Sequence, residues 1–269
     1  MWASGILPGR PVDTLFRRSL DSHAMLLSLI RQILTVPAAT VVLGLAVILL
    51  CPLDPGKLLF NRIARLWSGI LCLAAGVKVE VVGLDRVVDS QPAVFVANHQ
   101  SLFDPPALFL TVPGKLRVIA KRSLFLVPIF GQALWAAGVI PINRRDRQSS
   151  IASMTRAAER IRSGLSVLVF AEGTRSPDGH LLPFKKGAFV LALQAGVPVQ
   201  PVLVRGSREV LPPGAFFPRP GRILVEFLQP IPTAGMTFED RQHLLTLATS
   251  RMQEAQNSLP GLQPVKSDG

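Results

Sequence analysis

The sequence predicts an α/β domain, with a central mixed sheet flanked by helices, preceded by apolar N-terminal helices. Three observations lead to this prediction. Short apolar runs alternate with segments of helical periodicity from about residue 77 onward. Residues 33–53 carry no charge. Half of the chain (49%) is hydrophobic and its mean hydropathy is +0.39, which suits a domain attached to a membrane better than a polytopic membrane protein.

The N-terminal part predicts membrane association. Residues 1–24 are polar and we expect a loose tail, whereas residues 25–75 should form membrane-associated helices. As a helix, residues 33–53 span about 30 Å, the thickness of a bilayer core, and the stretch begins too late for a cleaved signal peptide. The segment either crosses the bilayer or returns as a hairpin with the helix that follows.

That second helix, over 57–71, has a basic amphipathic pattern typical of the headgroup region. An alternative is a helix packed on the protein's own core. The apolar residues at steps of three and four are Leu59, Ile63, Leu66, Trp67 and Ile70. The basic residues among them are Lys57, Arg62 and Arg65.

We expect residues 76–258 to form the α/β domain and residues 259–269 to form a disordered tail. Gly164 and Gly196 should end two of the helices, and Thr237 should begin the last. The expected strands are 77–82, 93–97, 117–120, 138–143, 165–171, 197–204 and 222–227. The expected helical segments are 105–112, 124–137, 149–163, 187–195 and 237–257.

Charge and motif content exclude several classes of function. The net charge of +12 indicates a polyanionic partner. Basic runs interleaved with aromatic residues are absent, so we favour an anionic membrane surface and expect no nucleic acid. Cys51 and Cys72 form no CxxC pair, and we expect no metal site. The chain also contains no serine-hydrolase elbow, no P-loop and no dinucleotide fingerprint.

The segment 98–106 contains the best candidate for a general base. It follows the apolar run 93–97 directly, at the strand end where open α/β sheets place ligands. A carboxylate such as Asp104 can orient His99 for proton abstraction from an alcohol. Asp104 also precedes Pro105, a pattern that predicts a helix N-cap.

Cationic residues follow other predicted strands. Arg175, in Glu172-Gly173-Thr174-Arg175, offers a planar fork of donors suited to phosphate, although Glu172 and Arg175 could instead form a structural ion pair. Arg144, Arg145 and Arg147 follow 138–143, and Lys121-Arg122 follows 117–120. His180 lies in turn-forming sequence, which predicts an exposed position.

Over about residues 60–235 the sequence resembles the glycerolipid acyltransferase family, specifically the 1-acyl-glycerol-3-phosphate (lysophosphatidic acid) acyltransferases. Four segments match the family's blocks in order: Asn98-His99-x4-Asp104, 138–144, 170–176 and 197–202, with Ala171 in place of the usual proline. The resemblance implies a single acyltransferase domain. Pro198 and Pro201 would then shape the wall that binds the acyl chain.

The resemblance also implies the chemistry. His99 would deprotonate the sn-2 hydroxyl of lysophosphatidic acid, which attacks the thioester of acyl-CoA or acyl-carrier protein to give phosphatidic acid, with Asp104 orienting His99. The implied substrate-binding residues are Lys121, Arg144, Glu172, Gly173, Thr174 and Arg175. Backbone N–H groups near Gly173 would stabilise the oxyanion. No cofactor beyond the thioester co-substrate is implied, and the expected location is the inner cell membrane with the catalytic domain facing the cytoplasm.

Three alternatives remain open at this point. The same chemistry could act on another lysolipid, such as a lyso-ornithine lipid. The chain could be a catalytically inactive membrane-binding protein of the same fold. A basic nucleic-acid binder is the third reading, and it predicts salt-sensitive DNA retention.

Overall fold

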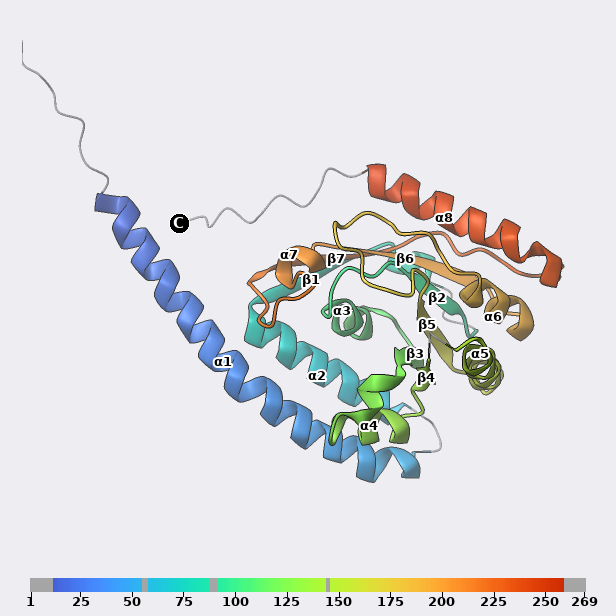
Figure 1. The fold of residues 1–269 in the computed structure, drawn as a ribbon, viewed down its shortest axis with the longest axis horizontal. Helices are drawn as coiled ribbons and strands as arrows, with labels where there is room; N and C mark the ends of the chain where they lie inside the picture. Colours follow the sequence, from blue (N-terminus) through green and yellow to red (C-terminus); the bar gives the residue numbers. More distant parts are fainter. Residues whose placement is uncertain (1–11, 55–57, 88–90, 144–145, 259–269) are drawn as a thin grey trace, which may run out of the picture.

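The computed structural model describes residues 12–54, 58–87, 91–143 and 146–258 (Figure 1). Within them, seven strands form one mixed sheet in the order β1-β7-β6-β2-β5-β3-β4. Every neighbouring pair is parallel except β6 and β7. The strands are β1 (Val77–Val82), β2 (Val94–Ala97), β3 (Leu116–Lys121), β4 (Ile140–Ile142), β5 (Ser166–Phe170), β6 (Val199–Arg205) and β7 (Gly221–Phe227). The predicted strands are therefore all present, with small shifts at their ends.

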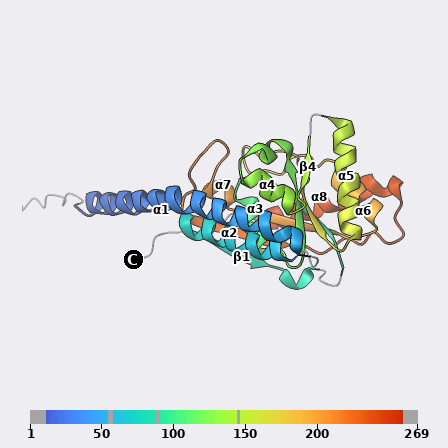
Figure 2. The ribbon, with the colours of Figure 1, turned by 90° about the horizontal axis from the view of Figure 1, so that it is seen from below.

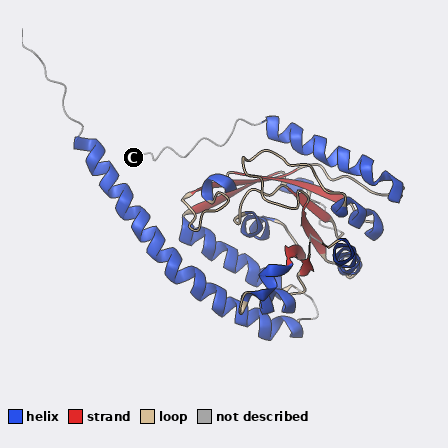
Figure 3. Cartoon of the chain, in the orientation of Figure 1, coloured by secondary structure: helices blue, strands red, loops and turns tan. Residues whose placement is uncertain are grey.

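Helices cover both faces of the sheet (Figure 3). They are α1 (Val12–Leu50), α2 (Leu59–Ala75), α3 (Asp104–Thr111), α4 (Phe130–Ala136), α5 (Arg147–Arg162), α6 (Gly187–Ala195), α7 (Ser207–Val210) and α8 (Arg241–Ser258). Short 3-10 turns are η1 (Cys51–Leu53), η2 (Leu84–Arg86), η3 (Arg122–Leu126) and η4 (Phe238–Asp240). The α/β class with a mixed sheet flanked by helices, and an apolar helix before it, is confirmed.

Two hydrophobic cores lie on opposite faces of the sheet. Phe95 and Ala97 of β2 face the core shared with α2, α3 and α4, whereas Val94 and Val96 face the core under α5, α6 and α8. All four side chains of this strand are buried, as expected for a strand covered on both faces. Thus the short run 93–97 is uniformly apolar because neither of its sides meets water.

Helix α1 begins at Val12, so residues 12–24 are helical and the prediction of a loose tail is wrong there. No proline or glycine occurs between Val12 and Val36, and Leu, Ala, Met and Arg in this stretch favour a helix. Residues 1–11 and the predicted tail 259–269 lie outside the described residues. The segment Leu29–Leu53 is long and apolar enough to cross a membrane, and little of it is buried.

Helices α1 and α2 pair antiparallel (Figure 2). Arg31 of α1 donates to Ala74 O at 2.9 Å, and Trp67 of α2 donates to Thr40 Oγ1 at 3.0 Å. The first segment therefore packs against the second as a hairpin.

The face of α2 predicted to meet lipid is not the face most buried by the domain. The side chains that pack inward are small or aromatic: Phe60, Ala64, Ser68, Leu71, Cys72 and Ala75. The predicted stripe is only half-buried or exposed, and Leu66 is 55% exposed. Helix α2 contacts both α1 and α3. It therefore packs on neighbours along more than one of its faces, and a single apolar stripe accounts for only part of this packing.

Candidate functional site

The site lies where two neighbouring parallel strands end. In the β2–β5 register Ala97 pairs with Phe170, so the loops that follow these strands begin side by side. Asn98 fixes the first loop because its side-chain amide donates to Val204 O at 2.9 Å and accepts from Val204 N at 2.7 Å. This buried double hydrogen bond ties the start of the loop to β6.

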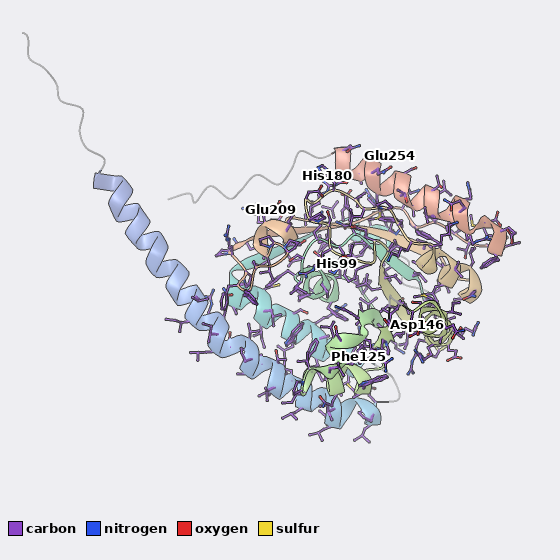
Figure 4. All side chains as sticks on the ribbon, viewed as in Figure 1. His99, Phe125, Asp146, His180, Glu209 and Glu254 are labelled. Atoms are coloured by element: carbon purple, nitrogen blue, oxygen red, sulfur yellow. The ribbon has the colours of Figure 1, made fainter. Side chains whose placement is uncertain are left out.

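His99 lies inside the domain close to α3 (Figure 4). Its ring is paired with Asp104. The distance from His99 Nδ1 to Asp104 Oδ2 is 2.7 Å, and the carboxylate is fully buried. The imidazole also stacks on Phe170, with 4.1 Å between ring centroids and 24° between planes. These contacts fix the ring and leave Nε2 as the nitrogen not engaged by the carboxylate.

Asp104 is not the N-cap of α3, contrary to the prediction. Phe103 occupies that position, and Asp104 is the first helical residue. Its Oδ2 instead accepts from the backbone N–H groups of Gln100 (2.7 Å) and Ser101 (2.8 Å) as well as from His99. The carboxylate therefore organises the backbone of the loop of residues 98–103 ahead of α3.

The loop that follows β5, residues 171–176, holds the backbone of His99. Glu172 Oε1 accepts from His99 N at 3.0 Å, and Ser176 N donates to His99 O at 2.7 Å. The peptide groups on both sides of the His99 Cα are therefore clamped by the segment 171–176. Asn98, Ser176 and Phe170 received no individual role from the sequence, because hydrogen bonds and ring stacking across the sheet carry no local sequence signal.

Glu172 is almost fully buried and lies beside Asp104. Burial raises the pKa of Glu172 to about 7, although backbone hydrogen bonds from His99 and Leu182 oppose this shift. Its contact with His99 places it behind the catalytic loop, and neither Glu172 nor Gly173 lines the cavity described below. Their predicted substrate-binding role stays a prediction.

Gly173 makes a tight turn after β5. Its φ of +73° favours glycine, and a Cβ there would lie 2.8 Å from the Lys185 side chain. The Gly173 N–H donates to Phe170 O at 3.0 Å, so this N–H, one of those expected to stabilise an oxyanion, is engaged in the turn.

A cavity of about 1350 Å³ begins at His99 and runs between α1, α2 and α4. Most of its lining is apolar, including Val36, Leu43, Val47 and Phe109. Glycine in the middle of α1 permits close packing there, since a Cβ on Gly44 would lie 2.9 Å from Ile129 Cγ2. The long apolar space has the dimensions and lining suited to a hydrocarbon chain.

The polar end of the cavity is cationic. Lys121, Arg122, Thr174 and Arg175 line it together with His99, and among the described lining residues there is no carboxylate. Three of the predicted substrate-binding residues are thus brought together with the candidate base. Arg144 lies outside the described residues. The alternative ion pair between Glu172 and Arg175 is not among the salt bridges of the described residues.

Pro198 and Pro201 do not form the wall of the cavity, contrary to expectation. Pro201 lies within β6, where its carbonyl accepts from Leu228 N at 3.0 Å, and Pro198 O accepts from Val94 N at 3.0 Å. Pro201 is thus part of the sheet, and Pro198 directly precedes β6 and bonds to β2. The cavity is lined instead by α1 and by the loop of residues 211–218, neither of which the motif analysis assigned to the site.

Comparison with known proteins identifies the domain. Residues 78–205 match the model of the acyltransferase family. The chain is 38% identical over 178 residues to the chloroplast 1-acyl-sn-glycerol-3-phosphate acyltransferase BAT2 of Brassica napus, covering 63% of this chain and 51% of that protein. It is also 38% identical to 1-acyl-sn-glycerol-3-phosphate acyltransferase beta of Homo sapiens over 166 residues, covering 61% of this chain and 60% of the relative.

A solved structure of an acyltransferase has a similar fold. The crystal structure of the 1-acyl-sn-glycerophosphate (LPA) acyltransferase PlsC from Thermotoga maritima superposes with a TM-score of 0.73 at 25% identity, covering 89% of this chain and 99% of that one. The chain spans about half to three-fifths of the length of the curated relatives named above. Residues 78–205 therefore match the acyltransferase family, and the chain is similar to relatives named as 1-acyl-sn-glycerol-3-phosphate acyltransferases.

Proposed function

We propose that this protein transfers an acyl chain from a thioester donor to the sn-2 hydroxyl of lysophosphatidic acid, giving phosphatidic acid. The observation that carries the proposal is the 2.7 Å pair of His99 and Asp104 at the cationic end of a long apolar cavity. The names of the curated relatives support the same activity.

His99 acts as the general base. Asp104 holds Nδ1 as the donor nitrogen, which makes Nε2 the acceptor for the hydroxyl proton, and the buried carboxylate stabilises the imidazolium that forms. The alkoxide oxygen attacks the thioester carbonyl, the C–S bond breaks, and the proton on Nε2 passes to the departing thiolate. The chemistry involves no acyl-enzyme intermediate.

Arg175 and Lys121 bind the phosphate of the acceptor, with Arg144 as a further predicted ligand. Two cations that line the cavity beside the base attract an anionic headgroup and bring its hydroxyl into attacking position. A lyso-ornithine lipid lacks this phosphate, so the cationic lining favours lysophosphatidic acid. The acyl chain of a substrate lies in the apolar part of the cavity.

The proposed setting is the cytoplasmic face of the inner membrane. The exposed apolar segment Leu29–Leu53 supports membrane attachment, and the net charge of +12 favours an anionic lipid surface. Acyl-CoA or acyl-carrier protein supplies the acyl chain, and no further cofactor takes part.

An assay of the purified protein tests the proposal. Lysophosphatidic acid, lysophosphatidylcholine and a lyso-ornithine lipid are offered as acceptors, each with acyl-CoA and with acyl-carrier protein. We expect phosphatidic acid as the main product, and Asp104→Asn should lower kcat by about 100-fold or more because the tautomer of His99 is no longer fixed. Preferred turnover of a phosphate-free acceptor would contradict the assignment, and absence of transfer to every acceptor would favour the inactive membrane-binding alternative.

A further inference from the structure

The loop of residues 211–218, between α7 and β7, is held in a defined position. Arg219 N donates to Val210 O at 2.8 Å and closes the base of the loop, while Ala215 N donates to Pro212 O at 3.1 Å within it. Ala215 packs partly against the core shared with α2 and α3. The position of the loop tip is therefore set by the domain.

The tip of the loop presents two aromatic side chains to the outside. Phe216 is 91% exposed and Phe217 is 50% exposed, yet both line the cavity that leads to His99. A side chain that is exposed and also lines a cavity marks the place where the cavity opens. The cavity thus opens beside two phenyl rings, whose exposure to water is unfavourable.

These rings continue the apolar surface of α1. Gln32 Nε2 donates to Pro218 O at 3.3 Å, which joins the loop to α1 directly beside Ile33 and Leu34. Both of these α1 side chains are exposed, and they lie in the segment long enough to cross a membrane. An exposed apolar patch continuous with such a helix fits lipid better than a separate protein partner.

The other end of the loop reaches the catalytic loop. Ser101 Oγ donates to Leu211 O at 2.8 Å, and Ser101 N donates to Asp104 Oδ2. One short loop therefore connects α1, the mouth of the cavity and the carboxylate that orients His99.

We propose that the loop of residues 211–218 is a second membrane contact, in which Phe216 and Phe217 insert among lipid acyl chains beside α1 and open the cavity directly to the bilayer. Exposed Arg219, next to the loop, lies where a cation meets anionic headgroups. The inference concerns where the protein touches lipid, so it holds independently of the reaction proposed above.

Site-directed spin labelling tests this contact. Single cysteines replace Phe216, Leu34 on α1 and Phe238 at the start of η4, each in a full-length Cys51→Ala, Cys72→Ala background. Phe238 is a matched control because it is as exposed as Phe217 but does not line the cavity. Nitroxide accessibility to oxygen, which concentrates in hydrocarbon, and to a water-soluble nickel complex is measured in phosphatidylethanolamine–phosphatidylglycerol vesicles.

We expect the labels at 216 and 34 to be accessible to oxygen and shielded from nickel, and the label at 238 to show the reverse. A water-exposed label at 216 beside a lipid-exposed label at 34 overturns the proposal. Water exposure at both positions also overturns it, as does shielding of 216 from both reagents, which indicates a protein partner or a second copy of the chain. The readout requires no turnover, so failure of acyl transfer would leave its result intact.

Discussion

The two ends of the cavity are built differently. Around His99, buried polar groups of β2, β5 and β6 and their loops hold one another by hydrogen bonds of 2.7–3.0 Å. Around α1 most of the cavity wall is apolar. Gln32 of α1 is bonded to the loop of residues 211–218 by donating to Pro218 O at 3.3 Å. Buried polar networks of this kind specify one geometry, whereas apolar packing tolerates change in shape.

The difference separates two tasks within one molecule. In the proposed function, the hydrogen-bonded end holds His99 in the fixed position that proton transfer requires. In the proposed function, the apolar end accommodates the flexible acyl chain and faces lipid. Substitutions at the first end should change the rate, and substitutions at the second should change stability and attachment.

Removal of the base should give the largest effect. His99→Ala should lower acyl transfer by about 100- to 10,000-fold because it removes the proposed general base for the hydroxyl proton. Sedimentation with vesicles should be unchanged, since attachment depends on the apolar end. His180→Ala, on an exposed turn, is the matched control. Equal loss of acyl transfer in both variants, or retained transfer in His99→Ala, would contradict the assignment of proton transfer to the hydrogen-bonded end.

The buried Glu172 should make stability depend on pH. Its pKa is raised to about 7, mainly by burial, so between about pH 4.5 and 7 the folded protein binds more protons than the unfolded chain. The free energy of unfolding should therefore fall as pH rises through this window, by up to about 3 kcal/mol.

Glu172→Gln should remove most of this slope, as followed by thermal unfolding in detergent at pH 5 and pH 8. Glu159→Gln, on exposed α5, should retain it. Parallel profiles for wild type and Glu172→Gln would show that the carboxyl titrates normally.

Removing a phosphate contact should weaken binding of the acceptor without abolishing the reaction. Arg175→Met should raise the KM for lysophosphatidic acid about tenfold, the value of one charged hydrogen bond, with a smaller change in kcat. A monoacylglycerol, which has no phosphate, should show the same KM with both proteins. Arg162→Met, at the exposed end of α5, serves as control, and an unchanged KM for lysophosphatidic acid in Arg175→Met would remove Arg175 from the phosphate site.

The smallest effect should come from the junction of hairpin and domain. Arg65 on α2 donates to Val112 O at 2.7 Å, and Arg65→Met should lower the free energy of unfolding by about 1 kcal/mol while leaving kcat unchanged. Arg62→Met, on the same helix, lacks such a bond among the described contacts and should be neutral. A loss of kcat in Arg65→Met would show that the two ends are coupled more closely than the contacts indicate.

Much of this arrangement could be predicted from sequence because strand runs and helix ends are local signals. The run 93–97 and the end of α6 at Gly196 are examples, as is the capping box in which Thr237 accepts from backbone and Asp240 reaches back to Thr237 N at 2.7 Å. Placing His99 and Arg175 at strand ends was enough to predict that they meet.

Long-range contacts could not be predicted in this way. Asp104 before Pro105 has the pattern of an N-cap, but the path of the loop decides what its carboxylate accepts. Likewise, the sequence of residues 211–218 has the turn residues of any surface loop, and only the fold brings it against α1. Periodicity alone also cannot tell which face of α2 packs against α1 and which against the sheet, so the setting of the stripe on α2 stays a prediction.

The junction between α2 and β3 also sets an order of assembly. Asn61 donates to Leu116 O at 3.2 Å, and Arg117 donates to Asn61 Oδ1 at 2.8 Å, a partner 56 residues later in the chain. At about 5–20 residues per second, the ribosome adds Arg117 roughly 3 to 11 seconds after Asn61. For that interval α2 lacks the strand that its buried Asn61 bonds to, so this junction closes only after the chain has been made as far as β3.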